Sequence, residues 1–77
     1  MKINVLFFGV LTDITGKDTL LFEDIADTDQ LNAKISDEYP GIKSVSYRLA
    51  VNQEIIDVNT ILNNGDEVAL MPPFAGG

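Results

Sequence analysis

Residues 2–9, KINVLFFG, have the composition of a β-strand, because β-branched and aromatic side chains fill the run and Gly9 closes it. Side chains in a strand point alternately to opposite faces. The alternation gives two apolar faces here, with Ile3, Val5 and Phe7 on one and Leu6 and Phe8 on the other. We expect such a strand at the centre of a sheet, or with one face on the core and the other on a partner.

Extended segments are also expected further along the chain. Residues 10–17 are predicted to form a short helical turn or loop, and residues 18–23 a strand that pairs with the first as a hairpin. Residues 47–57 read as two short strands around Asn52 and Gln53, because asparagine tolerates the positive φ of a tight turn.

The C-terminal part is predicted to end in a strand. Residues 58–67 read as a short helical turn followed by an Asn64–Gly65 turn, and EVALM at 67–71 reads as the last strand. Pro72 and Pro73 end that strand, because proline has no N–H to donate to a sheet ladder.

One helix of about three turns is expected between these strands, since apolar residues recur every four positions at Leu31, Ile35 and Tyr39. Asp27 or Thr28 is the predicted N-cap, and Pro40 and Gly41 stop the helix before a loop. This order predicts an α+β fold. If the last strand lies beside the first, the fold is a ubiquitin-like β-grasp, with a mixed sheet packed on one main helix. We expect that domain at 1–72 and an extended tail at 73–77.

The composition argues against an enzyme with its own catalytic residues. The chain of 77 residues contains no cysteine and no histidine, so the usual nucleophile–base pairs and cysteine-type zinc sites cannot form within it. The carboxylates form no persuasive pair, and Asp66 reads as the cap of a turn. We therefore expect no metal site and no bound cofactor.

The net charge limits the kinds of partner that the chain is expected to bind. A formal charge of −7 repels phosphate backbones and anionic lipid headgroups, so neither nucleic acid nor a membrane is an expected partner. The opening MKINVLFFGV lacks the length of a spanning helix and a small-residue cleavage site. We expect a cytoplasmic protein.

The ending MPPFAGG predicts a tail that enters a partner. Glycine has no side chain to clash in a narrow channel, and five residues from Pro73 to Gly77 reach about 17 Å when extended. The terminal carboxylate of Gly77 is then a substrate that must be activated, for example as an acyl-adenylate. Phe74 lies beyond the strand end and is expected to anchor in a partner groove, with Pro73, Ala75 and Gly76 as further contacts.

A second candidate for partner contact is the outer face of the sheet. A single helix covers only one side, so the face that carries Leu6, Phe8, Ala69 and Met71 would be an exposed apolar patch. Phe8 and Met71 are the predicted contacts on that face.

The ending NNGDEVALMPPFAGG resembles the MoaD family, the small subunits of molybdopterin synthase, in its G-D-E-V segment, short apolar strand, Pro-Pro and Gly-Gly. INVLFFG and LAVNQEIID are also similar to the first strand and the central A-V-N segment of that family. The resemblance covers both ends and the middle of the chain.

The resemblance implies a sulfur carrier of molybdenum cofactor biosynthesis. A MoeB-like enzyme would adenylate Gly77 with Mg-ATP and convert it to a thiocarboxylate. The tail would then enter a large MoaE-like subunit, and sulfur would pass to cyclic pyranopterin monophosphate to make molybdopterin. Catalytic side chains would belong to that subunit, and this chain would be the sulfur donor.

Two alternatives remain open. A ThiS-like carrier for the thiazole of thiamine, or a carrier for another pathway, shares the fold and the Gly-Gly ending, although the Pro-Pro favours the molybdopterin branch. The alternative from a different functional class is a β-grasp interaction module whose glycine tail is accidental.

Overall fold

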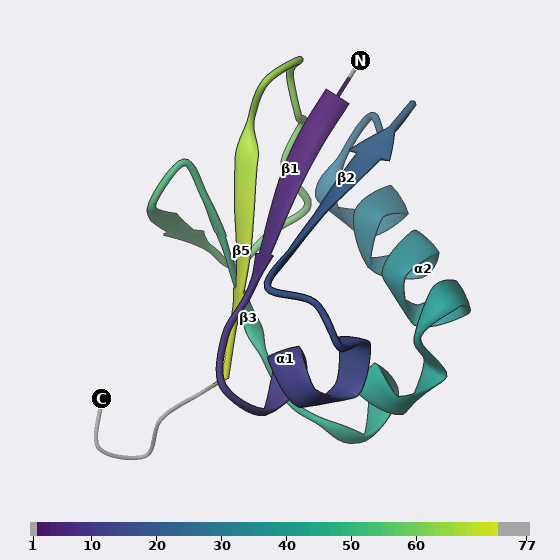
Figure 1. Cartoon of the computed structure of the whole chain (residues 1–77). Helices are drawn as coiled ribbons and strands as arrows, with labels where there is room; N and C mark the ends of the chain where they lie inside the picture. Colours follow the sequence, from purple (N-terminus) through teal and green to yellow (C-terminus); the bar gives the residue numbers. More distant parts are fainter. Residues whose placement is uncertain (1, 73–77) are drawn as a thin grey trace.

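A computed structural model describes residues 2–72 of the chain. Its elements follow one another in the order expected for an α+β chain, and Figure 1 shows them. They are β1 (Lys2–Phe7), α1 (Val10–Thr15), β2 (Thr19–Glu23), α2 (Thr28–Glu38), the 3-10 helix η1 (Pro40–Ser44), β3 (Arg48–Val51), β4 (Glu54–Ile56) and β5 (Glu67–Met71). None of the helices within residues 2–72 has the length and apolar character needed to cross a membrane.

The strands form one mixed sheet in the order β2-β1-β5-β3-β4. β1 pairs with β5 in parallel, with Val5 beside Val68, and its other neighbour β2 is antiparallel. β3 is antiparallel to both β5 and β4. The last strand thus lies beside the first at the centre of the sheet, which confirms the predicted β-grasp fold.

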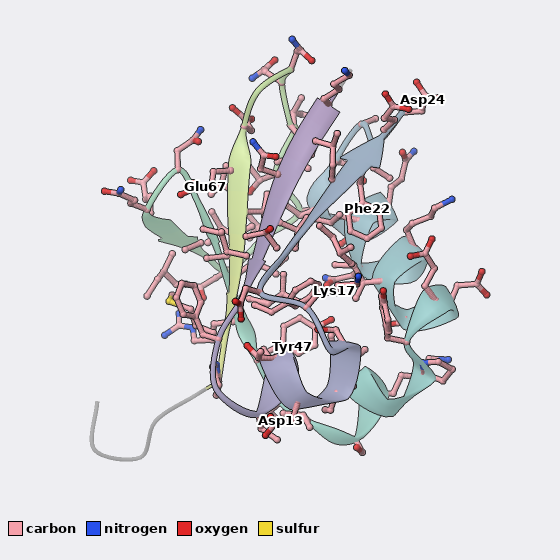
Figure 2. The ribbon with its side chains drawn as sticks, in the orientation of Figure 1. Asp13, Lys17, Phe22, Asp24, Tyr47 and Glu67 are labelled. Atoms are coloured by element: carbon pink, nitrogen blue, oxygen red, sulfur yellow. The ribbon has the colours of Figure 1, made fainter. Side chains whose placement is uncertain are left out.

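The core lies between one face of the sheet and the helices. Ile3, Val5 and Phe7 of β1 are 0%, 0% and 3% exposed, as the alternation of residues 2–9 predicts. Leu31 and Ile35 of α2 are fully buried and belong to the same cluster. Figure 2 shows Phe22 of β2 turned into the space between the sheet and α2.

α2 begins as the sequence predicts. Asp27 is the N-cap, and its Oδ1 accepts a hydrogen bond of 2.9 Å from the Gln30 amide. The Gln30 side chain accepts in return from the Ala26 amide at 3.0 Å. The first bond satisfies a donor that the helix start leaves free, and the second ties the residue before the N-cap to the first turn. Tyr39 follows the last helical residue as a partly buried C-cap.

Two local predictions were wrong. Residues 58–62 contain no helical turn, because this segment lies extended beside the start of α2: the Thr28 amide donates to the Thr60 carbonyl and the Leu62 amide to the Ala26 carbonyl. Their backbone groups therefore bond across to α2 instead of locally. The predicted loop after Tyr39 instead begins with η1, where Pro40 occupies the first turn and has no N–H that would need an acceptor.

Both predicted tight turns are confirmed. Asn52 and Gln53 have φ values of 49° and 73° between β3 and β4. Gly65 has φ 86° before β5, and the Asp66 amide donates to the Asn63 carbonyl at 3.0 Å. Left-handed φ values are easiest for glycine and are tolerated by asparagine. The second turn leads directly into β5, the strand that continues to the C-terminal residues.

Candidate functional site: the open sheet face and the start of the tail

One face of the sheet is left uncovered by the helices, and we call it the open face. Its residues follow from the register: Leu6 pairs with Ala69, Ala69 with Ala50, and Ala50 with Ile55. This cross-strand row runs over β1, β5, β3 and β4. The neighbouring rows of the open face contain Asn4, Leu21, Arg48, Glu67 and Met71. Figure 2 shows Glu67 on the side of β5 away from α2.

Exposed apolar side chains lie at the margins of the open face, and less exposed apolar residues lie at its centre. Leu21 of β2 is 54% exposed and Ile55 of β4 is 48% exposed. Leu6 and Ala69 are partly buried, and Ala50 is only 3% exposed. The face is therefore apolar and exposed at its margins, whereas Leu6, Ala69 and Met71 of the predicted patch are only partly exposed. Exposed apolar patches of this kind mark partner surfaces.

The open face contains one ion pair and, in a neighbouring row, the acidic side chain of Glu67. Arg48 donates to Asp57 at 2.7 Å, and the two side chains are 50% and 79% exposed. An ion pair in such an exposed place contributes little to stability, on the order of 0 to 1 kcal/mol. The pair leaves the face apolar along the row from Leu6 to Ile55.

The predicted contacts Phe8 and Met71 lie at one end of this sheet. Phe8 directly follows β1 and is 46% exposed, and Met71 is the partly buried last residue of β5. Phe7 pairs with Leu70 in the parallel register, so the next residue of each strand, Phe8 and Met71, lies at the same end of the sheet. Phe8 and Met71 therefore lie where the chain continues toward residue 73. Their contact with a partner stays a prediction.

The remaining predicted site residues lie outside the described residues. These are Pro73, Phe74, Ala75, Gly76 and Gly77, and the 72/73 boundary between domain and tail lies there too. Pro72 is the last residue described, and its ring lies next to Gly9.

Sequence reasoning missed three residues near this site. Ile55 and Leu21 were not singled out, although each is about half exposed on the open face. Ile55 stands beside another isoleucine, and only the hairpin register decides which of the two faces outward. Gly9 read as a simple strand end, but its φ of 58° and its contact with Pro72 place it beside the start of the tail.

The turn at the opposite end of β5 is tied to the sheet by side chains. Asp66 accepts from the Asn63 amide at 2.7 Å and from the Asn52 side chain at 3.0 Å. The Asn52 side chain in turn accepts from the Glu67 amide at 3.0 Å. The Asn63 bond first, and then the Asn52 bond, lower the pKa of Asp66 below its ordinary value, because both stabilise the carboxylate. Asp66 is the predicted cap of the turn.

A polar hollow of about 350 Å³ lies between the start of α2 and the β3–β4 hairpin. Its polar groups already satisfy one another, since Tyr47 donates to Asn32 at 2.8 Å and Arg48 to Asp57. Burial raises the pKa of Tyr47, although a hydrogen bond with Ser36 acts in the opposite direction. Within residues 2–72, every buried side-chain nitrogen or oxygen has a partner, and no group of three or more acidic side chains is placed to hold a metal ion. This hollow offers no chemistry comparable to the tail.

Comparison with known proteins decides the family. The model of the ThiS family matches residues 5–77. The chain belongs to the ThiS family. A curated relative of Mycobacterium tuberculosis, named molybdopterin synthase sulfur carrier subunit, is 35% identical over 100% of this chain and 99% of its own length. A relative of the same name in Chlamydomonas reinhardtii is 37% identical over 100% of both chains.

A solved structure of this family includes its partner. In Helicobacter pylori, the complex of subunits 1 and 2 of the molybdopterin-converting factor contains a chain that is 34% identical to this member of the ThiS family. The two superpose with a TM-score of 0.74 over 100% of both chains. The family resemblance inferred from the ending NNGDEVALMPPFAGG is thereby confirmed, and the relatives are named as sulfur carriers.

Proposed function

We propose that this chain is the sulfur-carrier small subunit of molybdopterin synthase, with the carboxylate of Gly77 as the reacting group. The observation that supports this most directly is the agreement between two whole-chain matches, from a bacterium and an alga, in the same name. The fold supports the same function, because β5 runs from a capped turn directly to Pro72 and the PPFAGG ending.

The proposed chemistry begins on a partner, a MoeB-like activating enzyme. The Gly77 carboxylate attacks the α-phosphorus of Mg-ATP, and pyrophosphate leaves. A sulfur donor at the oxidation level of hydrosulfide then attacks the acyl carbon, AMP leaves, and a thiocarboxylate remains. Activation is needed because a carboxylate is a poor electrophile. ATP and magnesium are thus used by the partner, and no cofactor resides on this chain.

The second partner in the proposal is a large MoaE-like subunit. Residues 73–77 enter its active site, and the thiocarboxylate sulfur passes to cyclic pyranopterin monophosphate to form the dithiolene of molybdopterin. Each charged carrier brings one sulfur atom, so more than one is needed for each dithiolene. The Helicobacter pylori complex supports a large-subunit partner for the fold. The open face, Phe8 and Met71 supply the docking surface beside the tail.

The test is a single-turnover loading reaction. The purified chain is incubated with a MoeB-like enzyme, Mg-ATP and sulfide, and its intact mass is recorded. We expect the exchange of one oxygen for sulfur at the C-terminal residue, and no exchange in a variant that ends at Ala75. An unchanged mass with an activating enzyme that loads another carrier in parallel would refute the proposal and leave a plain β-grasp interaction module.

A sulfur carrier for thiamine biosynthesis is the second candidate, because the matching model is that of the ThiS family. The two branches differ in the protein that receives the loaded tail. We expect co-elution with the large synthase subunit and formation of molybdopterin in the reconstituted reaction. Binding to thiazole synthase alone would assign the chain to the thiamine branch.

A further inference from the structure

The turn between β1 and α1 touches the point from which the C-terminal tail begins. Figure 1 shows this turn next to the end of β5. A β-carbon at position 9 would lie 3.0 Å from Pro72 Cγ and 3.8 Å from Pro72 Cδ. Ordinary contacts of a β-carbon are 3.4 to 4 Å, so an added β-carbon would force the Pro72 ring to move by a few tenths of an ångström.

Gly9 cannot easily move away from Pro72, because its turn is anchored on both sides. The Thr12 amide donates to the Gly9 carbonyl at 3.1 Å, and the Leu11 amide donates to the Phe8 carbonyl at 3.1 Å. The Thr12 hydroxyl also donates to the Phe7 carbonyl at 3.1 Å. The backbone of Gly9 has φ 58° and ψ −134°, a conformation that side chains with L chirality rarely adopt.

Pro72 cannot adapt by rotating a side chain. Its ring is bonded to its own backbone nitrogen, so a displaced Cγ displaces the main chain of residue 72. Met71, the preceding residue, is held by its pairing with Arg48 in the β3–β5 ladder. The ladder and Gly9 together therefore fix Pro72, the residue to which 73–77 are attached.

We propose that Gly9 is a positioning residue for the C-terminal tail, and that it acts through its contact with the Pro72 ring. This inference rests on the proposed sulfur-carrier function. Residues 73–77 reach about 17 Å when extended, so a displaced Pro72 changes the point and the direction from which that reach begins. Errors of about 1 Å in the position of a reacting group cost about 100-fold in rate.

The experiment measures kcat and KM for loading by the activating enzyme, with Mg-ATP and sulfide, as the concentration of carrier is varied. We expect Gly9→Ala to lower kcat at least about tenfold and to change KM less than about twofold, because the substitution leaves the sheet surface unchanged while Gly77 is misplaced. The matched control is Gly16→Ala. Gly16 also has a positive φ of 71°, but a β-carbon there meets nothing within 4 Å.

A second variant tests the contact from the other side. Pro72→Ala removes the ring without placing strain in the turn, so we expect it to fold normally and to lose several-fold in kcat. In the Pro72→Ala background, Gly9→Ala is expected to cost no further activity. If Gly9→Ala fails to fold, the Pro72→Ala variant still tests whether the contact between Gly9 and the Pro72 ring positions the tail.

The outcomes separate the two proposals. Wild-type protein that is never loaded would refute the sulfur-carrier function itself. Wild-type protein that is loaded, with Gly9→Ala indistinguishable from Gly16→Ala or Pro72→Ala indistinguishable from wild type, would overturn only the role of Gly9. A tenfold cost of Gly9→Ala that persists in the Pro72→Ala background would overturn the route through Pro72.

Discussion

Phe7 and Phe8 are neighbours in the chain, yet Phe7 is 3% exposed in the core and Phe8 is 46% exposed beside the start of the tail. Phe7 belongs to the hydrophobic cluster between sheet and helices. Substituting each of them in turn therefore tests stability and the predicted partner contact separately.

Phe7→Ala is expected to lower the free energy of unfolding by about 3 to 5 kcal/mol, which approaches the whole stability of a small domain. Phe8→Ala is expected to change it by no more than about 0.5 kcal/mol. Phe8→Ala should instead raise the Kd for the large subunit about tenfold, as loss of an aromatic anchor does. Urea denaturation and titration calorimetry measure the two effects.

Val58→Ala is the control for Phe8→Ala. Val58 is 75% exposed but lines the hollow beside α2, so its truncation should leave the Kd unchanged. Equal losses of affinity for the two variants, or none for Phe8→Ala, would remove Phe8 from the docking surface.

Deletion of Gly76 and Gly77 is expected to abolish sulfur loading and to leave the melting temperature nearly unchanged. Among residues 2–72, the buried core runs from Ile3 to Leu70, and both glycines follow it in the chain. Loading is followed by intact mass and melting by circular dichroism. A large drop in melting temperature would mean that the glycines have a structural role.

Thr28 joins α2 to the segment before β5, and its side chain is 2% exposed. Its hydroxyl donates to Asn59 Oδ1 at 3.1 Å and accepts from the Thr60 amide at 2.9 Å. Thr28→Val keeps the shape but removes the acceptor of the Thr60 amide, whereas Asn59 Oδ1 keeps its bond from the Asp29 amide, so we expect a loss of about 1 to 3 kcal/mol. For a domain of this size, each kcal/mol lowers the melting temperature by about 4 to 8 °C.

Thr19→Val serves as the control for Thr28→Val, because Thr19 is exposed on β2. It should melt close to wild type. If Thr28→Val also melts like wild type, the bonds to Asn59 and Thr60 contribute nothing net to stability.

Asp66 gives the stability of the fold a dependence on pH. Its pKa is lowered in the folded state, mainly by the Asn63 amide and then by Asn52, from an ordinary value of 3.8. The contribution of the carboxylate is therefore complete above 3.8 and is lost as the pH falls through the lower folded pKa. Asp66→Asn should destabilise the protein at neutral pH, and the difference from wild type should shrink in acid.

Urea denaturation of wild type and Asp66→Asn at several pH values measures this difference. Asp37→Asn is the control for the loss of one exposed negative charge on α2. A difference between Asp66→Asn and wild type that stays constant into acid would show that the carboxylate is not the group responsible.

The local order of elements could be predicted from the sequence because it depends on short-range chemistry. Alternation in residues 2–9 predicts a strand with two apolar faces, the repeat at Leu31 and Ile35 predicts α2, and Asp27 is recognised as a cap. The extended segment at 58–62 could not be predicted, because its backbone bonds to Ala26 and Thr28, about 30 residues away.

The sequence alone determined that the chain ends in PPFAGG, and the role predicted for that ending follows from the covalent structure of proline and glycine. Only the tertiary structure decided that β5 lies parallel to β1, that Ile55 and Leu21 share the open face, and that Gly9 touches Pro72. Those relationships join residues far apart in the chain, and they depend on strand register and burial, which no local pattern specifies.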